Sequence, residues 1–471
     1  MDFRLLVKQP TGSDSSQPSI TLEGNQWFLS ESLNIDSDSI PKYACVSYVW
    51  GPGRLANPIH SSVLMSDRTL TVLCAAIRNS HFDAFWIDAF CVPVDPVYKG
   101  PTLESMGYIY AQALKVIAVL APRSFAAIQQ MTAFKKGDAI SSELLDDMER
   151  EVWINSVWTY QEVVNSTGMF FVGEDTADGN MLDCAYFLNG IGYYMAQYSK
   201  AFSLTVFEMR KRYPKLDTFE DLAADWMMAG YTERSALEIM SNMGRRVFDD
   251  PKNYFYSMIG ALTQKPSQRS KKPSVETLAE SFMAVAEEKG DYSFVFSSAP
   301  RDERPGLEWR PRPQLLRAGV TWRVDGEMLK GTKEPGGIRL HEIVVVHPGE
   351  AVGLVARSII YTWMNALELE SEPDAVIAIK MRELLKFLGF TGTGRTILTE
   401  HGFAYPQEEV PEGAAVEVWL ATGVYYLFGA PAMIVAHVDD TARYIPAVFA
   451  GSGRWLEGRT DVFIPMSSAR L

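Results

Sequence analysis

Cysteine is scarce in this sequence, whose 471 residues contain only Cys45, Cys74, Cys91 and Cys184. These four are widely spaced, form no CxxC pair and have no histidines at zinc-finger spacing. The pattern argues against a disulfide framework and against a structural zinc site, and it favours reduced thiols in an intracellular protein. We therefore expect a cytoplasmic protein without a metal site.

The sequence also lacks the motifs of the common enzyme classes. It contains no HExxH, GxSxG or Walker pattern, and no other signature of a cofactor site, so we expect no cofactor. Basic residues are fewer than acidic ones: the chain has 44 Lys and Arg and 58 Asp and Glu, which gives a net charge of −14. No domain-sized basic surface can attract a phosphate backbone, so nucleic acid is not an expected partner.

Long apolar runs are rare, and the exception is residues 418–436, which carry no charge and have the length of a membrane span. Gly423, Gly429 and Pro431 divide this run into short pieces rich in Val, Tyr and Ile. A buried β-hairpin with its turn at 429–431 is therefore the better interpretation. The N-terminus has no apolar stretch followed by a cleavage pattern, so we expect no signal peptide and no membrane association.

The residues that are present suit a large globular protein. Apolar residues make up 47% and charged residues 22% of a chain that is too long for one ordinary core. The chain holds 11 Trp, 24 Phe, 20 Tyr and 20 Met, which can fill several cores or line apolar pockets. We expect two or three domains.

Strand and helix patterns alternate in the first part of the chain. Nearly uninterrupted apolar strands are indicated at 43–50, 84–90, 115–121 and 168–173, with helical spacing between them. Such strands, separated by helices, are typical of a mostly parallel α/β sheet.

Two regions of different character follow. Residues 176–300 have helical patterns almost throughout, whereas 301–471 contain β-patterned runs between Gly and Pro turns. One of these runs is 351–360, and a single helix is indicated at 374–389. The sequence thus predicts an α/β domain at 1–175, a helical middle region and a β-rich C-terminal region.

Polar and aromatic residues are expected at one edge of the predicted sheet. In an open parallel sheet, ligands bind beyond the carboxyl ends of the strands. The first strand brings Ser47, Tyr48, Trp50 and Gly51 to that edge, where the glycine permits close approach of a ligand, and the second brings Asp88. Asp88 either lines the cleft or caps the following loop, and both interpretations stay open.

A second carboxylate lies in the segment VWTYQEVV at 157–164. Trp158 precedes Glu162 by four residues, so on a helix the indole and the carboxylate share one face. Burying a charge without a partner is costly, so the position of Glu162 requires a partner in space. We expect Glu162 to reach the same edge as Asp88, which makes both carboxyl groups candidates for the site.

Four segments in register resemble the fungal heterokaryon incompatibility (HET) domain: YACVSYVWG, FWIDAFC, MGYIYAQALKVIAVL and VWTYQEVV. HET domains are considered similar to Toll/interleukin-1 receptor (TIR) domains, whose NAD-cleaving members carry a catalytic Glu four residues after a Trp. The resemblance implies a TIR-like N-terminal fold, a place in incompatibility or cell-death signalling, and a role for Trp158 and Glu162 in hydrolysing NAD or a related nucleotide.

Part of the family pattern is replaced. The family's CIxQ is CVPV here, so that Val94 stands in place of a glutamine, and the arginine before Trp158 is absent. These changes remove groups suited to an anionic ligand. They leave open a cofactor-free cyclase or isomerase, for example of a Diels–Alder type, acting on an apolar terpenoid or polyketide intermediate. A third alternative is a non-enzymatic interaction module that self-associates.

Overall fold

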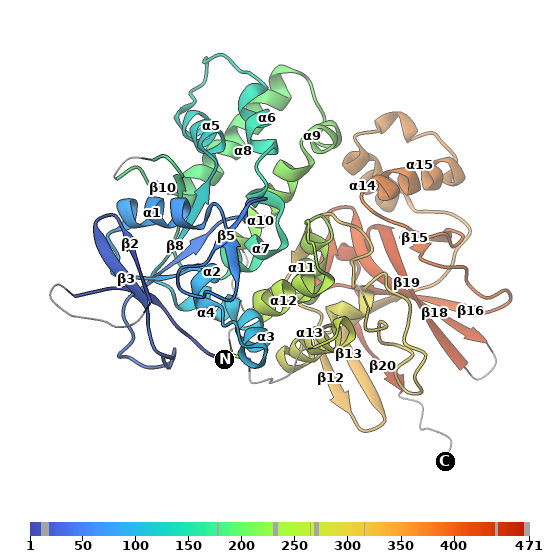
Figure 1. Cartoon of the computed structure of the whole chain (residues 1–471). Helices are drawn as coiled ribbons and strands as arrows, with labels where there is room; N and C mark the ends of the chain where they lie inside the picture. Colours follow the sequence, from blue (N-terminus) through green and yellow to red (C-terminus); the bar gives the residue numbers. More distant parts are fainter. Residues whose placement is uncertain are drawn as a thin grey trace. The chain divides into compact units, whose positions relative to one another are not determined.

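The computed structural model describes residues 1–10, 18–176, 179–228, 234–263, 265–267, 273–314, 316–438 and 441–465. The chain divides into two compact units (Figure 1). The first consists of Met1–Met228 and Arg246–Pro273, and the second of Ala229–Arg245 and Ser274–Leu471. The chain therefore leaves the first unit, contributes one segment to the second and then returns to complete the first.

A parallel group of strands forms the centre of the sheet in the first unit. Strand β4 (Ala44–Ser47) lies between β7 (Ala84–Trp86) and β8 (Lys115–Leu120), and β8 pairs with β9 (Met169–Gly173), all in parallel. All four strands are almost entirely buried, which explains their continuous apolar sequence. These are the four strands that the sequence indicates, and the α/β prediction is confirmed.

Antiparallel strands extend both edges, so the complete sheet is mixed. Its order is β10-β9-β8-β4-β7-β1-β3-β2. The added strands are β1 (Leu6–Lys8), β2 (Ser19–Leu22), β3 (Asn25–Leu29) and β10 (Leu182–Asp183). Unlike the four parallel strands, they are only partly buried and mix polar with apolar residues, which explains why the pattern of the sequence did not reveal them.

The second predicted strand ends earlier than expected. It stops at Trp86, and Asp88 begins the short helix α2 (Asp88–Cys91). The backbone turns there because the amide of Cys91 donates to the carbonyl of Ile87 at 2.8 Å. A short acidic side chain also suits the start of a helix.

Helices α3, α4, α7 and α12 pack together beside the parallel strands (Figure 1). Helix α12 has a clear start in the sequence, where Asp250 accepts from the amide of Lys252 at 2.9 Å and Pro251 occupies the first turn. The contact with α4 requires glycine, because a Cβ on Gly107 would lie 1.8 Å from the carbonyl oxygen of Gly260.

Described helices of this unit are α1 (Thr69–Ser80), α2, α3 (Pro96–Glu104), α4 (Met106–Gln112), α5 (Pro122–Ala133), α6 (Glu143–Glu149), α7 (Val157–Val164), α8 (Cys184–Ala201), α9 (Val206–Arg212), α10 (Pro214–Met228) and α12 (Pro251–Leu262).

The second unit is built on an antiparallel sheet in the order β12-β13-β16-β18-β19-β15-β14, with β20 paired to β13 and β17 joining β18 to β11. Its helices include α11 (Ala236–Met243), α13 (Val275–Lys289), α14 (Leu354–Met364) and α15 (Asp374–Phe387). The strands are β11 (Val324–Gly326), β12 (Gly331–Glu334), β13 (Gly337–Val346), β14 (Ile397–Thr399), β15 (Gly402–Pro406), β16 (Ala415–Ala421), β17 (Val424–Tyr426), β18 (Gly429–Val438), β19 (Thr441–Gly451) and β20 (Thr460–Pro465).

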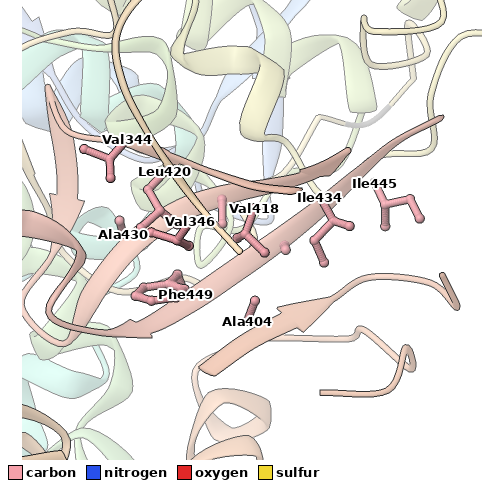
Figure 2. Close-up of a cluster of buried hydrophobic side chains, with 11 residues drawn as sticks. Val344, Val346, Ala404, Val418, Leu420, Ala430, Ile434, Ile445 and Phe449 are labelled. Carbon is pink, nitrogen blue, oxygen red and sulfur yellow. The ribbon is translucent and has the colours of Figure 1, made fainter. Parts of the chain in front are cut away.

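An apolar cluster fills one face of this sheet (Figure 2). Alternate residues of β18 contribute to it, as the two-residue period of a strand requires: Ala430, Ala432 and Ile434. The remaining members are Val344, Val346, Ala404, Val418, Leu420, Ile445, Ala447 and Phe449.

The predicted turn at 429–431 is wrong, although the segment 418–436 does form buried strands. Pro431 lies inside β18, opposite Val448 of β19. Its missing amide is tolerated because the pairing of β18 with β16 begins only at Ala432, so that one side of Pro431 is outside the ladder.

The β prediction for 351–360 is also wrong, because helix α14 starts at Leu354. Among its buried residues, Ala356 and Ile360 lie four positions apart on one helical face, and Tyr361 follows Ile360 directly. Short apolar runs fit both periods, which explains the error. Among the described residues, no helix combines the length and the apolar character needed to cross a membrane.

Helices of the region 176–300 are shared between the units: α8, α9, α10 and α12 belong to the first, and α11 and α13 to the second. The three-domain division drawn from the sequence stays a prediction.

Candidate functional site

A cleft of about 520 Å³ opens at the carboxyl ends of β4 and β7 in the first unit. Tyr48 and Trp50 follow β4, Asp88 follows β7, and α7 contributes Trp158 and Glu162. The cleft is therefore lined by both carboxyl groups and three of the aromatic residues that the sequence indicates.

Glu162 is held by a chain of buried hydrogen bonds. The hydroxyl of Ser47 donates to its carboxylate, and the indole nitrogen of Trp153 donates to Ser47 Oγ at 2.8 Å. Because an indole N–H can only donate, it directs the proton of Ser47 towards Glu162. Glu162 is 5% exposed, whereas Ser47 is 1% exposed and lies behind the cleft wall.

Burial raises the pKa of Glu162 to about 8. The hydrogen bond from Ser47 opposes this effect, the negative charge of Asp88 adds to it, and a hydrogen bond with Tyr110 lowers the pKa again. The carboxyl group therefore exchanges its proton near neutral pH and not in the acid range, which is where a general base or acid is most effective.

Asp88 has one oxygen towards the cleft and one towards its own backbone. Trp50 Nε1 donates to Oδ2 at 2.7 Å, and the amide of Ala89 donates to Oδ1 at 2.7 Å. Burial raises the pKa of Asp88, while the bonds from Trp50, Ala89 and Tyr48 lower it. Asp88 thus lines the cleft and stands in the first turn of α2, which begins without a side-chain cap.

The remaining predicted site residues lie at different depths. Val94 is 39% exposed on the cleft wall, and the ring of Trp158 stacks on Tyr256, with ring centroids 6.4 Å apart. Gly51 is buried outside the cleft lining, and its amide donates to Ser66 Oγ at 2.8 Å. A Cβ on Gly51 would lie 2.2 Å from a side-chain oxygen of Asp67, so a larger residue at this position would displace that side chain.

One wall of the cleft was not anticipated from the sequence. It comes from the segment at which the chain returns to the first unit, and includes Val247, Phe248, Asp249 and Asn253. The sequence does signal a helix start at 250–251, and these residues lie around that start. The signal does not show what they face.

This returning segment also holds the start of α7. The amide of Val157 donates to the carbonyl of Val247 at 3.2 Å, and the amide of Val247 donates to the carbonyl of Asn155 at 2.9 Å. The guanidinium of Arg246 donates to the carbonyl of Ser156 at 3.1 Å and to Thr159 Oγ1 at 3.2 Å. Residues far along the chain therefore position the helix that carries Glu162.

Two cations also line the cleft, Arg54 of β5 (Arg54–Ala56) and Lys99 of α3. The sequence analysis did not single them out, because isolated charged residues on a short hairpin and a short helix have no distinctive pattern. Strand β5 forms that hairpin with β6 (Leu64–Ser66).

Comparison with known proteins identifies the part of the chain that carries the two carboxyl groups. Residues 43–162 match the family model described as Heterokaryon incompatibility protein (HET). The match includes Asp88 and ends at Glu162, and it leaves out the returning segment around Arg246. No curated protein and no solved structure matches the chain.

Proposed function

We propose that this chain, whose residues 43–162 match the heterokaryon incompatibility (HET) family model, hydrolyses the N-glycosidic bond of NAD or a related nucleotide in an incompatibility or cell-death response. The observation that carries the proposal is the position of Glu162, a carboxyl group supported by buried Ser47 and facing a cleft with exposed aromatic walls.

The chemistry follows from the charge that develops on the substrate. As the bond between ribose C1′ and the nicotinamide nitrogen breaks, its electron pair leaves with the ring, and positive charge builds on the ribose. The carboxylate of Glu162 stabilises this charge and takes a proton from the water whose oxygen bonds to C1′. The raised pKa of Glu162 makes it a better base than an ordinary carboxylate.

The aromatic residues suit the nicotinamide ring of the bound substrate. Trp50 is 37% exposed and Trp158 is half-buried at the cleft wall, so each can offer part of a ring face. A nicotinamide ring that carries a positive charge is attracted to the face of an indole. Asp88, fixed by Trp50, adds negative charge beside the reacting end.

A second candidate is a cofactor-free cyclase or isomerase of an apolar intermediate. Exposed Val94, Val152 and Val247 on the cleft walls favour it, and so does the raised pKa of Glu162. Below a pH of about 8 a protonated Glu162 can donate a hydrogen bond to a substrate carbonyl. In this mechanism the protonated form of Glu162 is the active one, whereas hydrolysis of the N-glycosidic bond requires its carboxylate form.

The test is release of nicotinamide from NAD by the purified protein, comparing wild type with Glu162→Gln. We expect Glu162→Gln to keep the fold and to reduce kcat by about 10²–10³, because the amide cannot accept the proton. Glu143→Gln is the matched control, since Glu143 is exposed at the start of α6, outside the cleft lining. Equal rates for wild type and Glu162→Gln would contradict the assignment. If no variant turns over NAD, a panel of terpenoid and polyketide substrates tests the cyclase, and failure there favours an interaction module.

A further inference from the structure

We infer that Arg54 and Lys99 form an anion-binding subsite that takes the diphosphate of the ligand. The inference rests on the proposed function for the identity of the whole ligand, a dinucleotide, but the subsite itself follows from the charges in the cleft.

The two cations stand out against their surroundings. The chain has a net charge of −14, and the cleft lining includes the carboxyl groups of Asp88, Glu162 and Asp249. Nevertheless, within the described part of the chain neither Arg54 nor Lys99 forms an ion pair with a carboxylate. Their positive charge therefore remains available for an anionic ligand.

Arg54 is held in place by its own loop. Its Nη1 donates to the carbonyls of Gly51 and Gly53 at 2.5 and 2.9 Å. The guanidinium carbon lies 5.2 Å from the ring centre of Trp50, in a cation–π contact. These interactions use one nitrogen and fix the plane of the guanidinium, while Nη2 and Nε carry further N–H groups for phosphate oxygens.

Lys99 approaches the cleft from a different element. It lies one helical turn before Leu103, which also lines the cleft, so this face of α3 is directed to the ligand. The nearest acid along this helix, Asp95, uses Oδ1 to accept from the amide of Val97 at 2.9 Å. The ammonium group of Lys99 supplies a second, mobile point charge.

Two cations on separate walls fit an anion whose charge is spread over two groups. A diphosphate offers oxygens to both, whereas a single carboxylate is matched by one guanidinium alone. An uncharged terpenoid or polyketide leaves both cations without a partner. With the diphosphate at Arg54 and Lys99, the nicotinamide riboside end of a dinucleotide is left for Glu162 and the indoles.

The experiment uses inorganic pyrophosphate, ADP-ribose and nicotinamide riboside as probes of the full chain. By calorimetry at low salt, we expect Arg54→Gln and Lys99→Gln each to weaken binding of pyrophosphate and of ADP-ribose about tenfold. Arg123→Gln and Lys136→Gln, two exposed cations outside the cleft lining, are the matched controls and should leave both affinities unchanged. A thermal melt of each variant confirms that it is folded.

Kinetics separate this inference from the proposed function. For wild type, KM should be lower for NAD than for nicotinamide riboside, and the double variant should raise KM for NAD alone. If NAD is cleaved and the double variant leaves its KM unchanged, the subsite is rejected and the proposed function stands. If pyrophosphate binds through Arg54 and Lys99 but NAD is not cleaved, the subsite stands and the proposed function falls. Absence of pyrophosphate binding, or binding unaffected by either substitution, overturns the inference.

Discussion

Glu162 lies in an apolar helical segment because its carboxyl group reaches the end of β4, where the hydroxyl of Ser47 donates to it. The partner that its burial requires is thus another buried polar side chain, which is itself oriented by Trp153. The bond lowers the pKa of Glu162 but does not cancel the effect of burial, so the pKa stays at about 8.

The pH dependence of the reaction distinguishes the two proposed chemistries. If Glu162 acts as the base of nucleotide hydrolysis, kcat/KM rises by up to about tenfold per pH unit below 8 and is constant above it. If its acid form activates a carbonyl, kcat/KM falls above 8 instead. Asp88→Asn should move the inflection to lower pH, because the Asp88 carboxylate raises the pKa of Glu162. An inflection that stays in place would show that another group controls the profile.

The raised pKa of Glu162 also predicts how stability depends on pH. Between 4.5, the usual pKa of the group, and about 8, the folded protein holds a proton that the unfolded chain has released. The contribution of Glu162 to stability is therefore complete below 4.5 and is lost as the pH rises towards 8. Urea unfolding across this range should show a shallower decline for Glu162→Gln than for wild type, and parallel curves would contradict the assigned pKa.

At the scale of elements, α7 depends on residues that follow it by about a fifth of the chain. Its first amide is bound by Val247, and Arg246 donates to the carbonyls of Ile154 and Ser156 and to Thr159. Arg246 is 4% exposed, so these bonds are protected from water. The position of Glu162 is therefore set from both ends of the site, by β4 on one side and by the returning segment on the other.

Replacing Arg246 with Met should disturb stability and activity together. Removing the guanidinium abolishes its buried hydrogen bonds to the carbonyls of Ile154 and Ser156 and to Thr159, and we expect a loss of about 2–4 kcal/mol in the free energy of unfolding. Activity per folded molecule should fall as well, because the start of α7 loses its support. Urea unfolding and nicotinamide release measure the two effects. The control is Arg150→Met, which removes an exposed ion pair with Asp147 and should cost under about 1 kcal/mol.

At the scale of the whole molecule, the HET match and the folded unit have different extents. The match covers 43–162, but the first unit runs to Met228 and requires Arg246–Pro273 as well. Helix α12 in that later segment is buried along most of its length against α4 and α7. The family segment therefore contains the carboxyl groups of the cleft but not the complete core beneath them.

Truncation tests this extent directly. A chain ending at Met228 loses the buried side chains of Tyr254, Phe255, Met258 and Ile259. At about 1.5–3 kcal/mol each, their loss is comparable to the whole stability of a domain, so we expect no cooperative thermal transition. A chain ending at Pro273 keeps them and should melt cooperatively, as followed by circular dichroism. Equal, sharp transitions for both fragments would contradict the discontinuous unit.

The sequence by itself determined the elements with long, regular patterns. Strands β8 and β9 and helix α15 lie where periodicity places them, because this signal is local. Local signals failed at α14, because its short apolar run fits both the helical and the strand period. They also failed at Pro431, which lies inside β18 but just outside the paired residues of β16.

The candidate site divides in the same way. The spacing of Trp158 and Glu162 and the placement of Tyr48 and Asp88 just after two parallel strands could be predicted, since a parallel sheet brings its carboxyl ends to one edge. Only the tertiary structure could show that Ser47, 115 residues away, bonds to Glu162, and that Arg246 supports α7 from outside the HET segment. These contacts depend on how distant segments pack, and no pattern along the chain encodes a distance between them.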